Sequence, residues 1–144
     1  GDRFGLPGMK VLQFAFDGST DNPYLPSNIE KHSVTYTGTH DNNTLCGWLD
    51  GLSQKEIEYV CSFLGCEAGR ESLWRALLRC AYGTPSEKAI IPLQDILGLD
   101  GSHRMNTPGR PDGNWQWRFS WEMIERNAGR LEMAGSLAAR YGRS

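Results

Sequence analysis

The sequence lacks several features that mark particular classes of protein. Its longest apolar runs, such as Ala89-Ile90-Ile91, are far shorter than the roughly twenty residues that a membrane-spanning helix needs. Neither sign of charge dominates, because 15 Lys and Arg stand against 17 Asp and Glu, for a formal net charge of −2. These absences argue against a membrane protein and against a protein that binds nucleic acid. Internal repeats and low-complexity segments are also absent.

Cysteine is scarce, with four residues in the chain, and none of them forms a C-x-x-C pair. Cys61 and Cys80 fall at apolar positions of expected helices, where a free thiol behaves as a small hydrophobic side chain. The spacing therefore predicts reduced thiols rather than a disulfide framework, and with them a cytoplasmic protein.

The pattern of apolar residues predicts alternating strands and helices. Strands are expected over residues 9–16, 33–37 and 88–93, each one mostly buried. Helices are expected over residues 53–64, 71–82 and 122–141, with a short helical turn at 94–98. The last helix is expected to turn four side chains toward the core: Leu131, Ala134, Leu137 and Tyr141. This order predicts an α/β fold of parallel β/α units, although three strands are fewer than a complete sheet or barrel usually has.

A dense polar cluster, Thr39-His40-Asp41-Asn42-Asn43, follows the expected second strand. In α/β proteins functional side chains gather where strands end, and Asp17 and Asp95 follow the other two strands. Ordinary turn chemistry explains the same residues, because Asp and Asn side chains bond their own backbone and begin turns. Position alone favours turn chemistry over a functional site.

Two other kinds of site have little support in the sequence. A metal site could use His40 and Asp41 with His32 or His103, but no pair has the spacing of a helical zinc motif. A serine-type triad lacks the G-x-S-x-G turn that would carry its nucleophile. No motif indicates an organic cofactor, so neither a metal nor a cofactor is predicted.

Four segments carry a resemblance to a known family: LPGMKVLQFAF, DNPYLP, YTGTHDNNTLCGW and RMNTPGRPDGNWQWR. Together they resemble the C-terminal part of the amylomaltases, the bacterial 4-alpha-glucanotransferases, which are similar to the disproportionating enzymes of plants. The resemblance runs from about residue 3 to the end of the chain. The Gly-Thr-His-Asp-Asn and Arg-Met-Asn-Thr-Pro-Gly blocks occur in the same order as in that family.

The resemblance implies a (β/α)8 barrel related to the α-amylase superfamily, with the three expected strands as its sixth, seventh and eighth. Such a barrel needs about 250 residues. Residues 1–144 are therefore expected to be its C-terminal portion, about the last three β/α units, and no complete domain of their own.

The activity implied by the resemblance is retaining transfer of α-1,4-glucan segments between maltooligosaccharides. Retention needs two carboxyl groups about 5 Å apart, one as nucleophile and one as acid/base. The family carries them after its fourth and fifth strands, which would precede Gly1. The chain alone is therefore expected to be inactive, and the rest of its own barrel is an expected partner.

The resemblance assigns three residues of this chain to the sugar site. Asp41 resembles the family's transition-state carboxylate, His40 resembles the neighbouring histidine that bonds the same sugar, and Asn106 resembles a substrate-contacting amide. For Asn106 a turn-forming role is an equal alternative. The tryptophans receive structural roles: core packing is favoured over sugar stacking for Trp115 and Trp117, and Trp48 and Trp74 are assigned to structure.

Two other functions compete with the glucanotransferase hypothesis: a non-catalytic carbohydrate-binding module and a part of an α-amylase-type hydrolase. The Asn-Thr-Pro-Gly block and the following Asn-Trp-Gln-Trp-Arg favour the transferase, and the expected helices argue against a β-sandwich module. Three strands of an open barrel would leave unpaired edges, so the isolated chain is expected to form a dimer or higher oligomer.

Overall fold

The computed structural model describes residues 7–143, and its centre is a parallel three-stranded sheet. The strands are β1 (Gly8–Val11), β2 (Ser33–Tyr36) and β3 (Lys88–Ile90), in the order β1-β2-β3. Val34 of β2 is in register with Met9 on one side and Lys88 on the other. The α/β class and the parallel arrangement are therefore confirmed.

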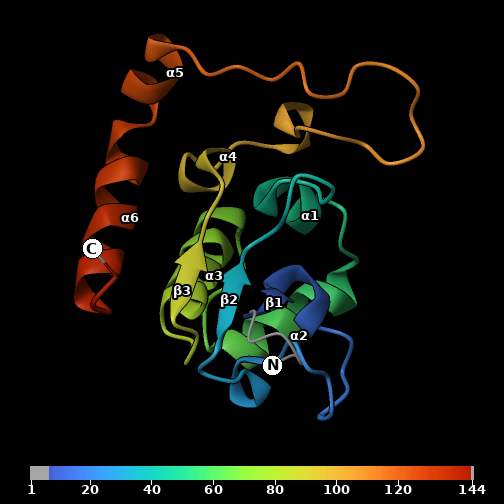
Figure 1. The fold of residues 1–144 in the computed structure, drawn as a ribbon, viewed down its shortest axis with the longest axis vertical. Helices are drawn as coiled ribbons and strands as arrows, with labels where there is room; N and C mark the ends of the chain where they lie inside the picture. The colour runs from blue at the N-terminus through green and yellow to red at the C-terminus, as the bar shows by residue number, and fades with distance from the viewer. Residues whose placement is uncertain (1–6, 144) are drawn as a thin grey trace.

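The described residues also form six α-helices: α1 (Leu45–Asp50), α2 (Gln54–Leu64), α3 (Arg70–Tyr82), α4 (Leu93–Ile96), α5 (Trp121–Arg126) and α6 (Ala128–Arg140). Figure 1 shows α2 and α3 behind the sheet, and α6 packs against α3. Short 3-10 helices lie at Leu12–Ala15, Pro26–Asn28 and Gly101–His103. None of the helices in residues 7–143 is long and apolar enough to span a membrane.

Local sequence signals explain the helices behind the sheet. Ser53 accepts a hydrogen bond from the backbone N–H of Glu56, whose carboxylate accepts the N–H of Ser53, so the predicted capping box is present. At the other end of α2, Gly65 has the left-handed φ of 66° that ends a helix. Helix α3 turns its predicted apolar face into the core, and that face is almost fully buried: Leu73, Trp74, Leu77, Leu78 and Ala81.

The predicted strands are too long where tertiary contacts bend the chain. Strand β1 ends at Val11, and the 3-10 turn that follows places Gln13 so that its side-chain amide donates to the backbone O of Asn43 at 2.9 Å. Strand β3 ends at Ile90, two residues before Pro92, which cannot donate to a sheet. The outer strands are also not buried throughout, because Met9 is 56% exposed and Ile90 is 45% exposed.

The predicted helix over 122–141 is two helices. Asn127 interrupts it, because its side-chain amide donates to the backbone O of Met123 at 2.9 Å and competes with the helical hydrogen bonds. Ala134 and Leu137 of α6 are buried as predicted, but Leu131 and Tyr141 are 39% and 41% exposed. The face that α6 packs against α3 is therefore narrower than the sequence pattern predicts.

Candidate functional site

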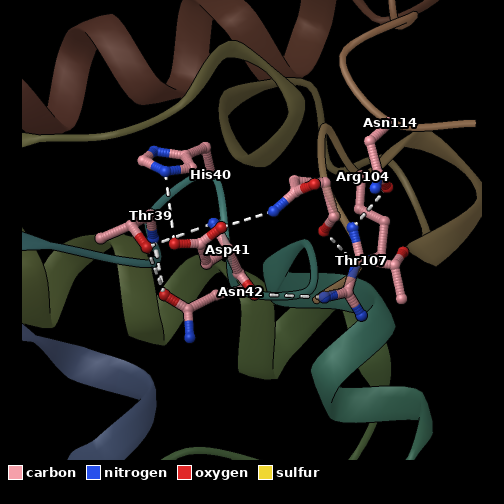
Figure 2. A network of polar contacts seen from close by, with 8 residues as sticks. Thr39, His40, Asp41, Asn42, Arg104, Thr107 and Asn114 are labelled. Atoms are coloured by element: carbon pink, nitrogen blue, oxygen red, sulfur yellow. Dashed lines mark hydrogen bonds and ion pairs between the residues drawn. The ribbon is translucent and has the colours of Figure 1, made fainter. Parts of the chain in front are cut away.

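The polar cluster after β2 lies at the end of the sheet toward which the strands point. In Figure 1 the long segment between α4 and α5 crosses this end of the molecule, above α1. Helix α1 begins directly after the cluster, with Thr44 as its N-cap, and it places the loop of residues 37–43 between the sheet and this crossing segment. Figure 2 shows the contacts that join the two segments.

Three residues assigned by the resemblance come together here. The Nε2 atom of His40 lies 3.3 Å from an Asp41 carboxylate oxygen. The other carboxylate oxygen of Asp41 accepts a hydrogen bond of 2.5 Å from the side-chain amide of Asn106, 65 residues away in the sequence. The side chains of His40 and Asp41 are 55% and 54% exposed. Asp41 thus remains open to a ligand while its orientation is set by two neighbours.

Arg104 holds the crossing segment against the loop, a role that the sequence pattern did not indicate. Its guanidinium donates to the backbone O of Asp41 at 3.2 Å and to the backbone O of Asn106 at 3.0 Å (Figure 2). The same side chain therefore connects the two segments that carry Asp41 and Asn106. A charged donor shared between two carbonyl groups favours one relative placement of the segments.

Turn chemistry operates in the same loop, but on other residues. Asn42 accepts hydrogen bonds from the backbone N–H and the hydroxyl of Thr39 at 2.8 and 2.9 Å (Figure 2), and Asn43 accepts the N–H of Thr44 at 2.8 Å. Asp17, at the exposed end of the first loop, accepts the N–H of Ser19. Turn formation thus accounts for Asn42, Asn43 and Asp17, whereas the side chain of Asp41 bonds a distant residue.

A buried carboxylate, that of Asp95, holds both ends of this loop by hydrogen bonds. Asp95 of α4 is 2% exposed, and its two oxygens accept the hydroxyl of Thr37 at 2.6 Å and the backbone N–H of Leu45 at 2.7 Å. Burial raises the pKa of Asp95 to about 6, although both hydrogen bonds favour the charged form. Thr37 and Leu45 stand at the two ends of the loop that carries Asp41, so one carboxylate fixes both ends.

A cavity of about 210 Å³ opens beside the cluster. Polar groups of the loop, including His40, line one part of it, and Pro92, Met105 and Trp115 line another. Asp95 also reaches its wall. A concave site with an apolar wall and a few convergent polar groups suits a small ligand that carries both hydroxyl groups and apolar ring faces.

The core position predicted for Trp115 is wrong. Trp115 is 52% exposed, and its ring centroid lies 4.8 Å from that of His40. Its φ of 62° is unusual for a bulky side chain, and its backbone N–H donates to the carbonyl of Met105 at 2.6 Å. Trp117 is half-buried and donates to Nδ1 of His103 at 3.0 Å. The assignments of Trp48 and Trp74 to structure are confirmed, since Trp74 lies in the hydrophobic core and Trp48 packs against it.

The histidines considered for a metal site do not converge. His103 accepts a hydrogen bond from Trp117. His32 lies 3.7 Å from Glu87, and it precedes β2, whereas His40 follows that strand. Within residues 7–143 no three His, Cys, Asp or Glu side chains are grouped so that they could hold a metal ion. The chemistry that the cluster can perform is hydrogen bonding to hydroxyl groups by an oriented carboxylate.

Comparison of the sequence with known proteins gives consistent matches. A family model described as 4-alpha-glucanotransferase matches residues 1–124. The chain is 46% identical over 143 residues to the chloroplastic/amyloplastic 4-alpha-glucanotransferase of Arabidopsis thaliana. The aligned region covers 96% of this chain and 24% of that relative. It is 46% identical over 125 residues to the 4-alpha-glucanotransferase of Thermus thermophilus, and this aligned region covers 82% of this chain and 25% of that relative. The chain spans about a quarter of the length of these relatives.

Solved structures resemble this one over nearly its whole length. An amylomaltase from Streptococcus agalactiae in complex with acarbose matches with a TM-score of 0.87 and 32% sequence identity, covering 97% of this chain and 28% of that one. The amylomaltase of Corynebacterium glutamicum matches with a TM-score of 0.66 at 18% identity, which supports the fold alone. The three-stranded parallel unit is therefore part of the amylomaltase fold.

Proposed function

The chain belongs to the 4-alpha-glucanotransferase family, and from that premise we propose that it is the closing portion of a (β/α)8 catalytic barrel. The proposed reaction of the whole protein is retaining transfer of α-1,4-glucan segments between maltooligosaccharides. Three parallel strands in consecutive order suit three successive β/α units of such a barrel. The remaining barrel is then the partner expected beside β1 and β3. A cytoplasmic location stays a prediction.

The contact between Asp41 and Asn106 is the observation that carries this proposal. An amide from a segment 65 residues away holds one oxygen of an exposed carboxylate, and His40 lies 3.3 Å from the other. A carboxylate that served only to form a turn would bond its own backbone. This one is available to accept hydrogen bonds from the hydroxyl groups of a sugar.

The proposed role of Asp41 is to favour the transition state of glycosyl transfer. As the sugar ring flattens and gains positive charge, hydrogen bonds from its hydroxyl groups to an oriented carboxylate become stronger, and this difference lowers the barrier. His40 and Asn106 would bind the same sugar and keep the carboxylate in position. Because the orientation exists before substrate binds, little reorganisation is needed during the reaction.

The nucleophile and the acid/base are proposed to lie in the rest of the barrel. Asp95 is the carboxylate that lines the cavity, but it is buried and both of its oxygens are occupied by donors. Asp41 and Asp95 therefore do not form the pair of accessible carboxyl groups that retention requires. We expect the 144-residue chain alone to show no turnover of maltotriose or amylose.

Asp41→Asn tests the proposal in a full-length protein that contains these residues. The amide keeps the size of the side chain and removes its charge, so we expect kcat on maltotriose to fall by about a thousandfold. The KM should change little, since the carboxylate acts mainly on the transition state. Asp17→Asn is a matched control, because Asp17 is an exposed carboxylate in a different loop, where it accepts the N–H of Ser19.

Wild-type turnover by the Asp41→Asn protein would refute the assignment of Asp41. Turnover by the isolated 144-residue chain would refute the proposed location of the nucleophile and acid/base. A full-length protein that binds maltooligosaccharides but never transfers them would support the alternative of a non-catalytic binding protein. Conversion of maltotriose to maltose and glucose, without any product longer than maltotriose, would instead indicate a hydrolase.

A further inference from the structure

Two of the four cysteines are brought together by the way helix α2 ends. The left-handed residue Gly65 reverses the chain, and the backbone N–H of Cys66 donates to the carbonyl of Cys61 at 3.1 Å. The N–H of Gly65 donates to the same carbonyl. In this kind of helix termination the residue after the left-handed glycine frequently contacts the side chain at the start of the turn. Here cysteines occupy both positions, and a side-chain hydrogen bond with Cys66 contributes to the raised pKa of Cys61.

The environment of these two thiols agrees with direct contact. Both are half-buried at the margin of the hydrophobic core. Burial raises the pKa of Cys61, and the adjacent Cys66 thiol raises it further. The two thiols therefore interact with each other, and each is partly exposed to solvent.

The other two cysteines lie inside helices α1 and α3 rather than at such a turn. Cys46 is 3% exposed, and burial raises its pKa to about 11. Cys80 packs against the core, and burial raises its pKa to about 11 as well. A thiol with a pKa of about 11 is protonated at neutral pH, so it reacts slowly with oxidants. Cys46 and Cys80 serve as internal controls for the reactivity of the pair.

We propose that Cys61 and Cys66 form a redox site that a low-molecular-weight disulfide such as oxidised glutathione converts to an intrachain disulfide. Neither the family match nor the proposed glucan transfer requires this site, and the inference is independent of the proposed function. The bond would join the last turn of α2 to the segment that leads into α3. It would thereby fix the left-handed turn at Gly65 covalently.

The reaction follows ordinary thiol–disulfide exchange. The Cys66 thiol loses its proton and its sulfur attacks one sulfur of oxidised glutathione, which releases one glutathione thiolate and leaves a mixed disulfide. Cys61 then loses its proton and attacks the Cys66 sulfur, which releases the second glutathione. Two protein thiols and one small disulfide become one protein disulfide and two small thiols, and the two electrons reside in the reduced glutathione.

The test uses the 144-residue chain and one tryptic digest. The reduced protein is incubated with oxidised glutathione, denatured, alkylated with iodoacetamide and digested. Cys61 and Cys66 fall in one peptide, residues 56–70, whereas Cys46 and Cys80 fall in residues 32–55 and 80–88. We expect peptide 56–70 to escape alkylation and to lose the mass of two hydrogen atoms, and the other two peptides to be alkylated.

Two variants separate the pair from general thiol reactivity. In Cys61→Ser the resolving thiol is gone, so Cys66 should stop at a stable glutathione adduct, while Cys80→Ser should form the disulfide as the wild type does. The proposal is overturned if peptide 56–70 is alkylated at both cysteines after oxidation. It is equally overturned if both cysteines keep separate glutathione adducts, or if oxidation joins two chains.

Discussion

The buried carboxylate of Asp95 makes stability depend on pH in a direction that can be measured. The pKa of a free aspartate is about 3.8, and burial raises that of Asp95 to about 6. Between these two values the folded protein holds a proton that the unfolded chain has lost. Raising the pH through this window therefore favours unfolding. The contribution of this group to stability is complete below the unfolded pKa and is lost as the pH rises through the folded pKa.

The size of the effect follows from the shift. At roughly 1.4 kcal/mol for each pKa unit, the shift corresponds to about 3 kcal/mol of unfolding free energy between low pH and neutral pH. Asp95→Asn removes the titration and keeps the shape, because the amide oxygen can accept from Leu45 and its NH2 can donate to the hydroxyl of Thr37. The difference in stability between variant and wild type should therefore grow in favour of the variant as the pH rises.

Urea unfolding followed by tryptophan fluorescence measures this difference directly. Trp74 donates to the backbone O of Asp95 and reports on the same part of the core. Between about pH 4.5 and 7.5 the difference should change by about 2 kcal/mol. Other titrating groups are present in both proteins and cancel. Parallel stability curves for the two proteins would refute the reasoning, because they would mean that Asp95 does not titrate in this range.

Two further predictions concern the loop and the sheet edges. A Cβ at Gly38 would lie 2.6 Å from the side-chain nitrogen of Gln13, so Gly38→Ala should displace Gln13 from Asn43 and cost about 2 kcal/mol in urea unfolding. Gly135→Ala is the control, because a Cβ at this position of helix α6 would meet nothing within 4 Å, so the change should be neutral or stabilising. Equal stability of the wild type, Gly38→Ala and Gly135→Ala would contradict the expected cost at Gly38. Within residues 7–143, β1 and β3 form the two edges of the sheet, so the isolated chain should sediment as a dimer or higher oligomer. A monomer at all concentrations would contradict that expectation.

Features that depend on neighbours in sequence were predictable. The capping box at Ser53, the apolar face of α3 and the alternation of strands with helices are local or periodic patterns, and the structure contains all of them. The breaks were not predictable in this way. The 3-10 turn after β1 depends on a hydrogen bond between Gln13 and Asn43, and the interruption at Asn127 depends on how one amide competes within a helix.

The candidate site was predictable only in part. The resemblance selected His40, Asp41 and Asn106, and the structure brings them together, but their roles stay predictions. Core packing is the predicted role of Trp115 because the resemblance assigns it no sugar contact. Its actual position beside His40 depends on a left-handed backbone, for which a tryptophan gives no signal. The hydrogen bonds that Arg104 and Asp95 make to the loop could not be predicted from neighbouring residues, because each joins segments that lie 50 or more residues apart in the sequence.

The two aspartates at the strand ends illustrate how burial divides one residue type between two tasks. Asp95 is 2% exposed, and both of its oxygens hold the ends of the loop, so it can orient neighbours but cannot reach a substrate. Asp41 is half-exposed, and its oxygens face a single amide and a histidine, so it can exchange partners when a ligand arrives. The orientation of an exposed carboxylate is poorly fixed by its own contacts, because water competes for its hydrogen bonds. Asp95 fixes both ends of the loop and thereby supports the orientation that Asn106 and His40 give to Asp41.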